Sequence, residues 1–201
     1  MSWIKVIPYA QSTGRLRAIY ERIKGPGDAV DNIVQIHSLR PHTMQGHMAL
    51  YKSVLHHTGN HLPPWLLETV GMYVSLLNRC DYCVDHHLAG LRRLLDDDDR
   101  VATIRPALEQ GDFAAAFTAR EGAILEYSRQ LTVSPADMNE TAAGSLREVG
   151  LTDGEILEVN QVVAYFAYAN RTVLGLGVTT RGDILGLSPG DSADERDWQH
   201  H

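Results

Sequence analysis

The chain has 201 residues, 44% of them hydrophobic and 21% charged, which is the composition of an ordinary globular protein with one buried core. Its formal net charge of −7 argues against nucleic-acid binding, which needs a concentrated basic surface. The sequence contains no apolar run near the roughly 18 to 20 residues of a membrane span, and its N-terminus lacks the apolar core of a secretory signal. We therefore expect a cytoplasmic protein with neither a nucleic-acid nor a membrane partner.

Helical periodicity recurs along the whole chain, and no segment alternates as a strand does. Prolines, glycines and capping residues divide this pattern into roughly eight to ten helices. The predicted helices cover approximately residues 12–24, 28–39, 41–57, 63–77, 80–95, 99–109, 117–131, 136–149 and 152–178. The expected fold is an all-α, single-domain helical bundle.

The last predicted helix has the clearest start signal, because Thr152 or Asp153 can cap it and Glu155 completes a capping-box pattern. After Gly182 the sequence becomes polar and acidic. We therefore expect a helical domain over residues 1–182, followed by a poorly ordered tail over residues 183–201.

The two cysteines of the chain, Cys80 and Cys83, lie three positions apart. A disulfide between them closes too small a loop to staple a fold, so a catalytic or metal-binding role is favoured. On a helix that starts near Cys80, Cys83 and His87 share one face, one turn apart. Cys80 then lies at the helix N-terminus, where unpaired amides and the helix dipole favour a thiolate.

The sequence separation between Glu68 and His87 limits how the helices around these thiols can be arranged. In one straight helix, Glu68 and His87 would lie roughly 28 Å apart, too far for proton transfer. A chain reversal at Asn78-Arg79 instead gives an antiparallel hairpin in which His87 faces residue 70 or 71, one turn from Glu68. Proton transfer between the two side chains therefore requires this helical hairpin. An apolar setting there would raise the pKa of the Glu68 carboxyl.

The pattern Glu68-x11-Cys80-x2-Cys83-x3-His87 resembles, at every position, the signature of the alkyl hydroperoxidase D family. That family belongs to the carboxymuconolactone decarboxylase-like superfamily of all-α proteins. The flanking residues 37–41 (HSLRP) and Asn170-Arg171 are similar to its peroxidase-related branch. The resemblance covers roughly residues 10–180.

This resemblance implies a two-cysteine peroxidase that uses no metal and no organic cofactor. Cys83 would be the thiolate that attacks the hydroperoxide and becomes a sulfenic acid, and Cys80 would condense with it to a disulfide. Glu68 and His87 would relay the proton. Tyr82 stands where better-studied members carry histidine; its phenol is a poor base at neutral pH but can donate a hydrogen bond to the leaving hydroxide.

The resemblance also implies partners for the reaction. An external dithiol would reduce the disulfide, and a lipoyl group carried by another protein serves members of this family. The chain is expected to assemble as a trimer or a hexamer, in agreement with the large apolar faces of its predicted helices.

Other interpretations stay open at this point. One is a carboxymuconolactone decarboxylase-like enzyme, and another is a non-catalytic, redox-sensing or zinc-binding helical protein. Zinc could be held by Cys80, Cys83 and His87 with Glu68 or His86 as the fourth ligand. The histidines at positions 37, 42, 47, 56, 57 and 61 show no spacing that converges on a metal and are interpreted as surface or helix-packing residues.

Overall fold

The computed structural model describes residues 2–201, which form helices and loops with no β-strand among them. The α-helices are α1 (Gly14–Ile23), α2 (Asn32–Gln35), α3 (Pro41–Leu55), α4 (Pro64–Leu77), α5 (Asp81–Leu95), α6 (Asp98–Gln110), α7 (Ala119–Val133), α8 (Glu140–Glu148) and α9 (Asp153–Leu176). The predicted all-α, single-domain fold is confirmed. Within residues 2–201, no helix combines the length and apolarity that a membrane crossing requires.

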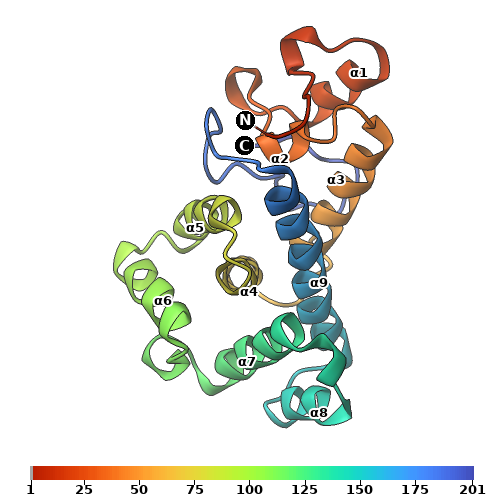
Figure 1. Cartoon of the computed structure of the whole chain (residues 1–201). Coiled ribbons are helices and arrows are strands. Elements are labelled where there is room, and N and C mark those ends of the chain that lie inside the picture. Colours follow the sequence, from red (N-terminus) through yellow and green to blue (C-terminus); the bar gives the residue numbers. More distant parts are fainter. Residues whose placement is uncertain (1) are drawn as a thin grey trace.

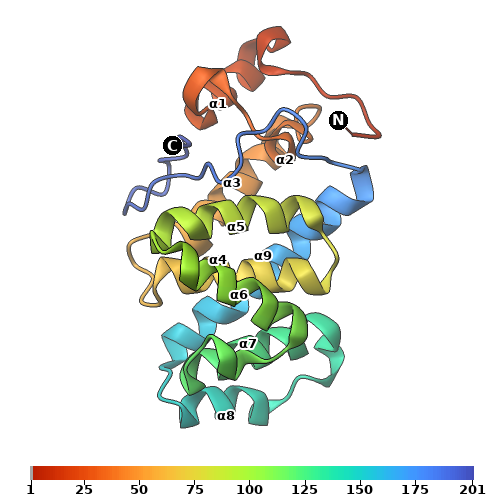
Figure 2. The same cartoon turned by 90° about the vertical axis from the view of Figure 1, so that its left-hand side faces the viewer.

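Helix α4 lies at the centre of the molecule and packs against α5, α7 and α9 (Figure 1). Every one of its residues from Leu66 to Ser75 is buried, as expected of a helix that is surrounded on all sides. Helix α9 spans about 36 Å at 1.5 Å per residue and links the two ends of the molecule. Figure 2 shows α1, α2 and both termini at one end, and α7 and α8 at the other.

The helix boundaries follow from local chemistry. Pro41 and Pro64 occupy the first turns of α3 and α4, where no backbone N–H is needed. The predicted capping box of α9 is present: the Thr152 side chain accepts from the Glu155 backbone N–H, and the Glu155 carboxylate accepts from the Thr152 N–H. These signals explain why the central helices begin where the sequence predicted.

A close approach between α4 and α9 depends on Gly71. A Cβ atom at this position would stand 2.1 Å from the Phe166 ring, which is fully buried. The missing side chain therefore lets the ring of α9 lie directly on the backbone of α4. This contact sets the distance between the two helices beside the predicted site.

The second predicted helix begins later than expected. Asp28, the first residue of the predicted range 28–39, has a left-handed backbone with φ of 62°, and its carboxylate pairs with Lys24 Nζ at 2.6 Å. Helix α2 starts at Asn32 instead. The Asp28 carboxylate thus forms an ion pair with Lys24, the C-cap residue of α1.

The C-terminal segment, residues 183–201, also differs from expectation, because it packs on the helices instead of forming a poorly ordered tail. Trp198 and His200 in it are buried. Lys52, itself fully buried on α3, donates from Nζ to the Gly190 carbonyl and to Ser192 Oγ. A polar and acidic composition did not reveal these few anchoring contacts, which come from side chains far away in the sequence.

Candidate active site

The predicted helical hairpin is confirmed. Helix α4 ends at Leu77, and Arg79 takes a left-handed backbone with φ of 56° that reverses the chain. The Cys80 N–H donates to the Ser75 carbonyl at 2.9 Å, and Cys80 is the N-cap residue of α5. The reversal sets α5 beside α4 and brings residues nineteen positions apart into contact.

Glu68 and His87 form the closest polar contact of this hairpin, with 2.5 Å between Glu68 Oε2 and His87 Nδ1. Glu68 is only 3% exposed. Burial acts to raise the pKa of the carboxyl, but His87, His56 and Arg93 outweigh it, so the pKa lies below its usual range. The raised pKa that an apolar setting would give is therefore not found, and Glu68 is an ionised partner of the imidazole.

Phe166 fixes the imidazole from its other side. Its ring meets the His87 ring edge to face, with 4.5 Å between the centroids and 78° between the planes. The position of Phe166 depends in turn on Gly71, which leaves room for it. His87 is thus held by a carboxylate from α4 and an aromatic ring from α9.

The two thiols lie within reach of each other. Their Sγ atoms share a hydrogen bond at 3.2 Å, and both residues are buried and unbridged. The hydrogen bond with Cys83 lowers the pKa of Cys80, with support from the Cys83 backbone amide. The same hydrogen bond, together with burial, raises the pKa of Cys83. The hydrogen bond between the two sulfur atoms therefore favours the thiolate at Cys80 and leaves the proton on Cys83.

A buried amide network supports this pair. Asn170 on α9 donates from Nδ2 to Ser75 Oγ at 3.0 Å and accepts at Oδ1 from Asn78 Nδ2 at 2.9 Å. The Asn170 side chain also acts to lower the pKa of both thiols. Asn170 ties α9 to the turn between α4 and α5, and only the Asn170-Arg171 pair in the sequence pointed to it.

The Tyr82 hydroxyl is directed to the C-terminal segment. Its O–H donates to Asp183 Oδ2 at 2.7 Å, and its oxygen accepts from the Ile33 N–H at 3.1 Å. To donate to a leaving hydroxide, as the sequence predicted, the phenol would have to exchange its bond to Asp183. Tyr82 connects α5 to α2 and to the C-terminal segment.

A cavity of about 40 Å³ opens beside these groups. Cys83, Glu68 and His87 line it, together with Asp31 and His86. Cys80 does not border this cavity. It borders a second depression, together with Arg79, Asp81 and Thr180. The two thiols thus face different spaces.

Sequence reasoning missed several polar residues around the cavity. His56 stands with Nε2 3.9 Å from Glu68 Oε1, and His47 is buried in the cavity wall. Asp31 and Asp183 come from loop segments that carry no recognisable motif. Helical spacing relates residues within one element only, so it does not place loop residues in a shared cavity.

The zinc shell considered from the sequence is not formed. Among residues 2–201, the groups close enough to hold a metal ion do not include either cysteine. His87 is paired with Glu68, and His86 directs Nε2 to Asp183 Oδ2 at 3.2 Å. The adjacent histidines therefore belong to two separate polar clusters.

Residues 41–124 match the model of the carboxymuconolactone decarboxylase family. This segment contains α3 to α6 and the whole Glu68–Cys80–Cys83–His87 set. The resemblance to this family that the sequence predicted is thus confirmed over the segment that carries the signature. No curated protein sequence is significantly similar to this chain.

Solved structures share the fold of this alkyl hydroperoxidase D-like chain. The alkylhydroperoxidase AhpD core of a peroxidase-related protein from Ralstonia eutropha JMP134 is 20% identical, with a TM-score of 0.74 over 89% of this chain and 92% of that one. A peroxidase-related protein from Silicibacter sp. TM1040 is 21% identical, with a TM-score of 0.68 over 84% and 85% of the chains. A cysteine-to-alanine variant of the debrominase Bmp8, in complex with 2,3,4-tribromopyrrole, is 15% identical, with a TM-score of 0.70 over 90% and 95%.

Proposed function

We propose that this chain is a thiol-dependent peroxidase that reduces small hydroperoxides through Cys83 and Cys80. Its superfamily supports a peroxidase-related or carboxymuconolactone decarboxylase-like enzyme. The observation that carries the more specific proposal is that Cys83 borders the same cavity as the Glu68–His87 pair, while Cys80 lies 3.2 Å from it, sulfur to sulfur. An acid–base pair and a dithiol are the groups that such a reduction needs.

The first step forms a sulfenic acid. The Cys83 proton passes to His87, and the Cys83 sulfur attacks one peroxide oxygen, so the S–O bond forms as the O–O bond breaks. The departing alkoxide takes a proton from the His87–Glu68 pair and leaves as an alcohol. Cys83 has lost two electrons and the peroxide has gained them. The ionised Glu68 stabilises the imidazolium that holds the proton between these events.

The second step closes the disulfide. Cys80 attacks the Cys83 sulfenic sulfur, so the S–S bond forms as the S–O bond breaks, and the departing hydroxide takes a proton from solvent and leaves as water. The lowered pKa of Cys80 suits this step, because Cys80 is then a thiolate when the sulfenic acid appears. A dithiol reductant returns the two electrons. We propose that a lipoyl-carrying protein in a reducing cytoplasm supplies it and attacks from the depression that Cys80 borders.

The cavity size favours a small oxidant. A volume of about 40 Å³ is sufficient for only a few water-sized molecules, since each needs about 10–15 Å³. Hydrogen peroxide, or the head of an alkyl hydroperoxide, fits this space. A ring with several bromine atoms, such as the ligand of the debrominase structure, is larger than the cavity. This difference favours peroxide reduction over dehalogenation for this chain.

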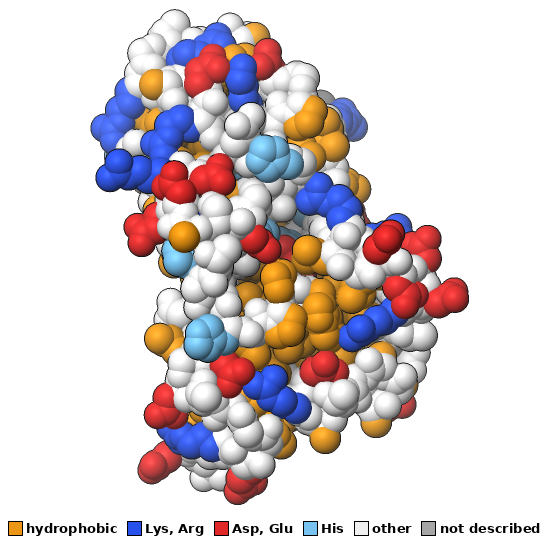
Figure 3. All heavy atoms as spheres, turned by 180° about the vertical axis from the view of Figure 1, so that it is seen from behind, with side chains coloured by type: hydrophobic (Ala, Val, Ile, Leu, Met, Phe, Trp, Pro, Cys, Tyr) orange, Lys and Arg blue, Asp and Glu red, His pale blue; other side chains and the backbone are white. Residues whose placement is uncertain are grey.

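We also propose that the chain forms a homo-oligomer. Hydrophobic side chains gather in a hollow on the face shown in Figure 3. Large apolar side chains that stand exposed on the molecule are Trp3, Ile4, Leu39, Leu50, Leu94, Val133, Leu157, Tyr168, Leu174, Ile184 and Leu185. Apolar surface that gathers in this way is typical of protein–protein contacts, and a trimer or a hexamer would cover part of it.

Peroxide consumption with a dithiol reductant tests the enzymatic proposal. We expect Cys83→Ser to abolish turnover. We expect Cys80→Ser to stop after one turnover with a sulfenic acid at Cys83 that dimedone traps. If both variants keep full turnover, the proposal is wrong. Turnover of a carboxymuconolactone in the same variants would instead support the lactone decarboxylase interpretation, in which the thiol pair has no role.

A further inference from the structure

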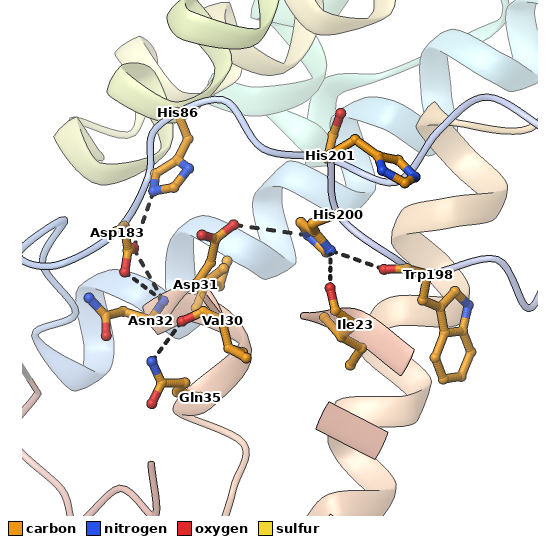
Figure 4. A network of polar contacts seen from close by, with 12 residues as sticks. Ile23, Val30, Asp31, Asn32, Gln35, His86, Asp183, Trp198, His200 and His201 are labelled. Carbon is orange, nitrogen blue, oxygen red and sulfur yellow. Dashed lines mark hydrogen bonds and ion pairs between the residues drawn. The ribbon is translucent and has the colours of Figure 1, made fainter. Parts of the chain in front are cut away.

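A second cluster of potential ligand groups lies beside the cavity, and two of its three members, Asp31 and His86, line it. Asp31 precedes α2, His86 belongs to α5, and Asp183 begins the C-terminal segment. One ligand atom of each residue lies within 4.8 Å of the others. Figure 4 shows the three side chains facing one another across the space between these segments. Neither the peroxidase proposal nor the family signature uses this cluster.

Asp183 is held firmly in this cluster. Its carboxylate accepts from the Tyr82 hydroxyl at 2.7 Å, from the Asn32 backbone N–H at 3.1 Å, and meets His86 Nε2 at 3.2 Å. Hydrogen bonds of this kind orient metal-binding carboxylates in proteins. The group is thus prearranged by neighbours that come from α2 and α5.

Asp31 has no hydrogen-bond partner for its carboxylate among the described residues, and the residue is 6% exposed. The nearest basic group is His200 Nε2 at 3.9 Å, beyond hydrogen-bond range. A buried carboxylate that makes no hydrogen bond has lost hydration without replacing it, which raises the free energy of the folded state.

Two carboxylates and one imidazole nitrogen converge on one space in this cluster. A divalent cation bound there would accept electron pairs from all three groups and satisfy the unbonded oxygen atoms of Asp31.

We propose that Asp31, His86 and Asp183 form a binding site for a divalent transition-metal ion of the Zn²⁺ type. One imidazole nitrogen and two carboxylate oxygens are a donor set that suits such ions and favours them over Ca²⁺. Ligand atoms about 2.0–2.2 Å from Zn²⁺ lie closer together than 4.8 Å, so the cluster contracts on binding. Three protein ligands leave a coordination position open toward the cavity.

The ion would join three parts of the chain that are distant in sequence. It would connect the C-terminal segment to α5 and to the start of α2, in addition to the contacts that these segments already make. Since the ion binds the folded chain and not the unfolded one, its presence raises the thermal midpoint. This expectation does not depend on the peroxidase proposal.

Calorimetric titration of the full-length chain with ZnCl₂ tests the site, and Co²⁺ absorbance provides a second signal. The chain is also titrated as the Cys80→Ser/Cys83→Ser double variant, so that the thiols do not compete for the metal. We expect one Zn²⁺ per chain in both proteins. We expect Asp31→Asn and His86→Gln to weaken binding at least about 100-fold, and Tyr82→Phe to weaken it about 10-fold through Asp183.

The matched control is His42→Gln, which removes an exposed histidine of α3 and should bind Zn²⁺ as the parent does. Circular dichroism of each variant separates loss of a ligand from loss of the fold. The proposal is overturned if the wild-type chain shows no saturable site for Zn²⁺ or Co²⁺. It is equally overturned if binding disappears with the two thiols, or persists unchanged when His86 and Asp31 are both replaced.

Discussion

Replacement of Glu68 by glutamine tests the proton relay with the least change in shape. The amide side chain would keep the size of the native one and a hydrogen bond to His87 but would remove the buried negative charge. In the native chain this charge lies 2.5 Å from the imidazole and is almost completely shielded from water. We therefore expect the oxidation of Cys83 by peroxide to slow while the fold is retained.

The expected magnitude follows from the type of contact. A hydrogen bond to a charged group contributes about 1.5–3 kcal/mol. Each 1.36 kcal/mol corresponds to about a factor of ten in rate. If this interaction is made fully only when the imidazole is protonated, its loss slows peroxide reduction by about 10- to 150-fold.

Stopped-flow measurement of thiol oxidation in a single turnover isolates this step from reduction by the dithiol. Glu109→Gln is the matched control, because Glu109 is paired with Arg105 on the exposed face of α6 and lies away from the cavity. We expect the control to react as the wild type does. A Glu68→Gln chain that folds normally and keeps its second-order rate constant within a factor of two would refute the relay.

Other consequences of the structure can be measured separately. Gly71→Ala drives a methyl group into Phe166, so urea unfolding should show a loss of about 1–3 kcal/mol, whereas Gly144→Ala, with open space around it, should lose nothing. The pKa of Glu68 is lowered in the folded state, so its contribution to stability is present above about pH 4.5 and is lost as the pH falls through the folded pKa. The free energy of unfolding of the wild type should therefore fall more steeply with acid than that of Glu68→Gln. Parallel plots of unfolding free energy against pH would contradict this. Lys52→Met removes two hydrogen bonds to the C-terminal segment. Limited proteolysis should therefore cut that segment at least about tenfold faster in the variant than in the wild type. An unchanged cleavage rate would show that Lys52 does not anchor the segment.

The fold and the hairpin could be predicted because their signals are local. The prolines before α4, the Asn78-Arg79 break and the capping box of α9 each act within a few residues. The requirement that Glu68 reach His87 then left one arrangement of α4 and α5. The structure shows that contact directly.

The rest of the site depends on tertiary contacts that sequence spacing does not encode. The direction of the pKa shift at Glu68 is set by His56 and Arg93 as well as by His87, and these come from different elements. The use of the Tyr82 hydroxyl is decided by Asp183, 101 positions away. The packed C-terminal segment likewise depends on Lys52, whose buried position no sequence pattern indicated.

The separate surroundings of the two sulfur atoms bear on how the proposed enzyme would behave in a mixture of reagents. Cys83 borders one cavity and Cys80 another depression, so we expect the peroxide and the reducing dithiol to reach the sulfur atoms through different openings. Binding of one reagent then does not exclude the other. We therefore expect a large excess of the dithiol not to inhibit peroxide reduction competitively.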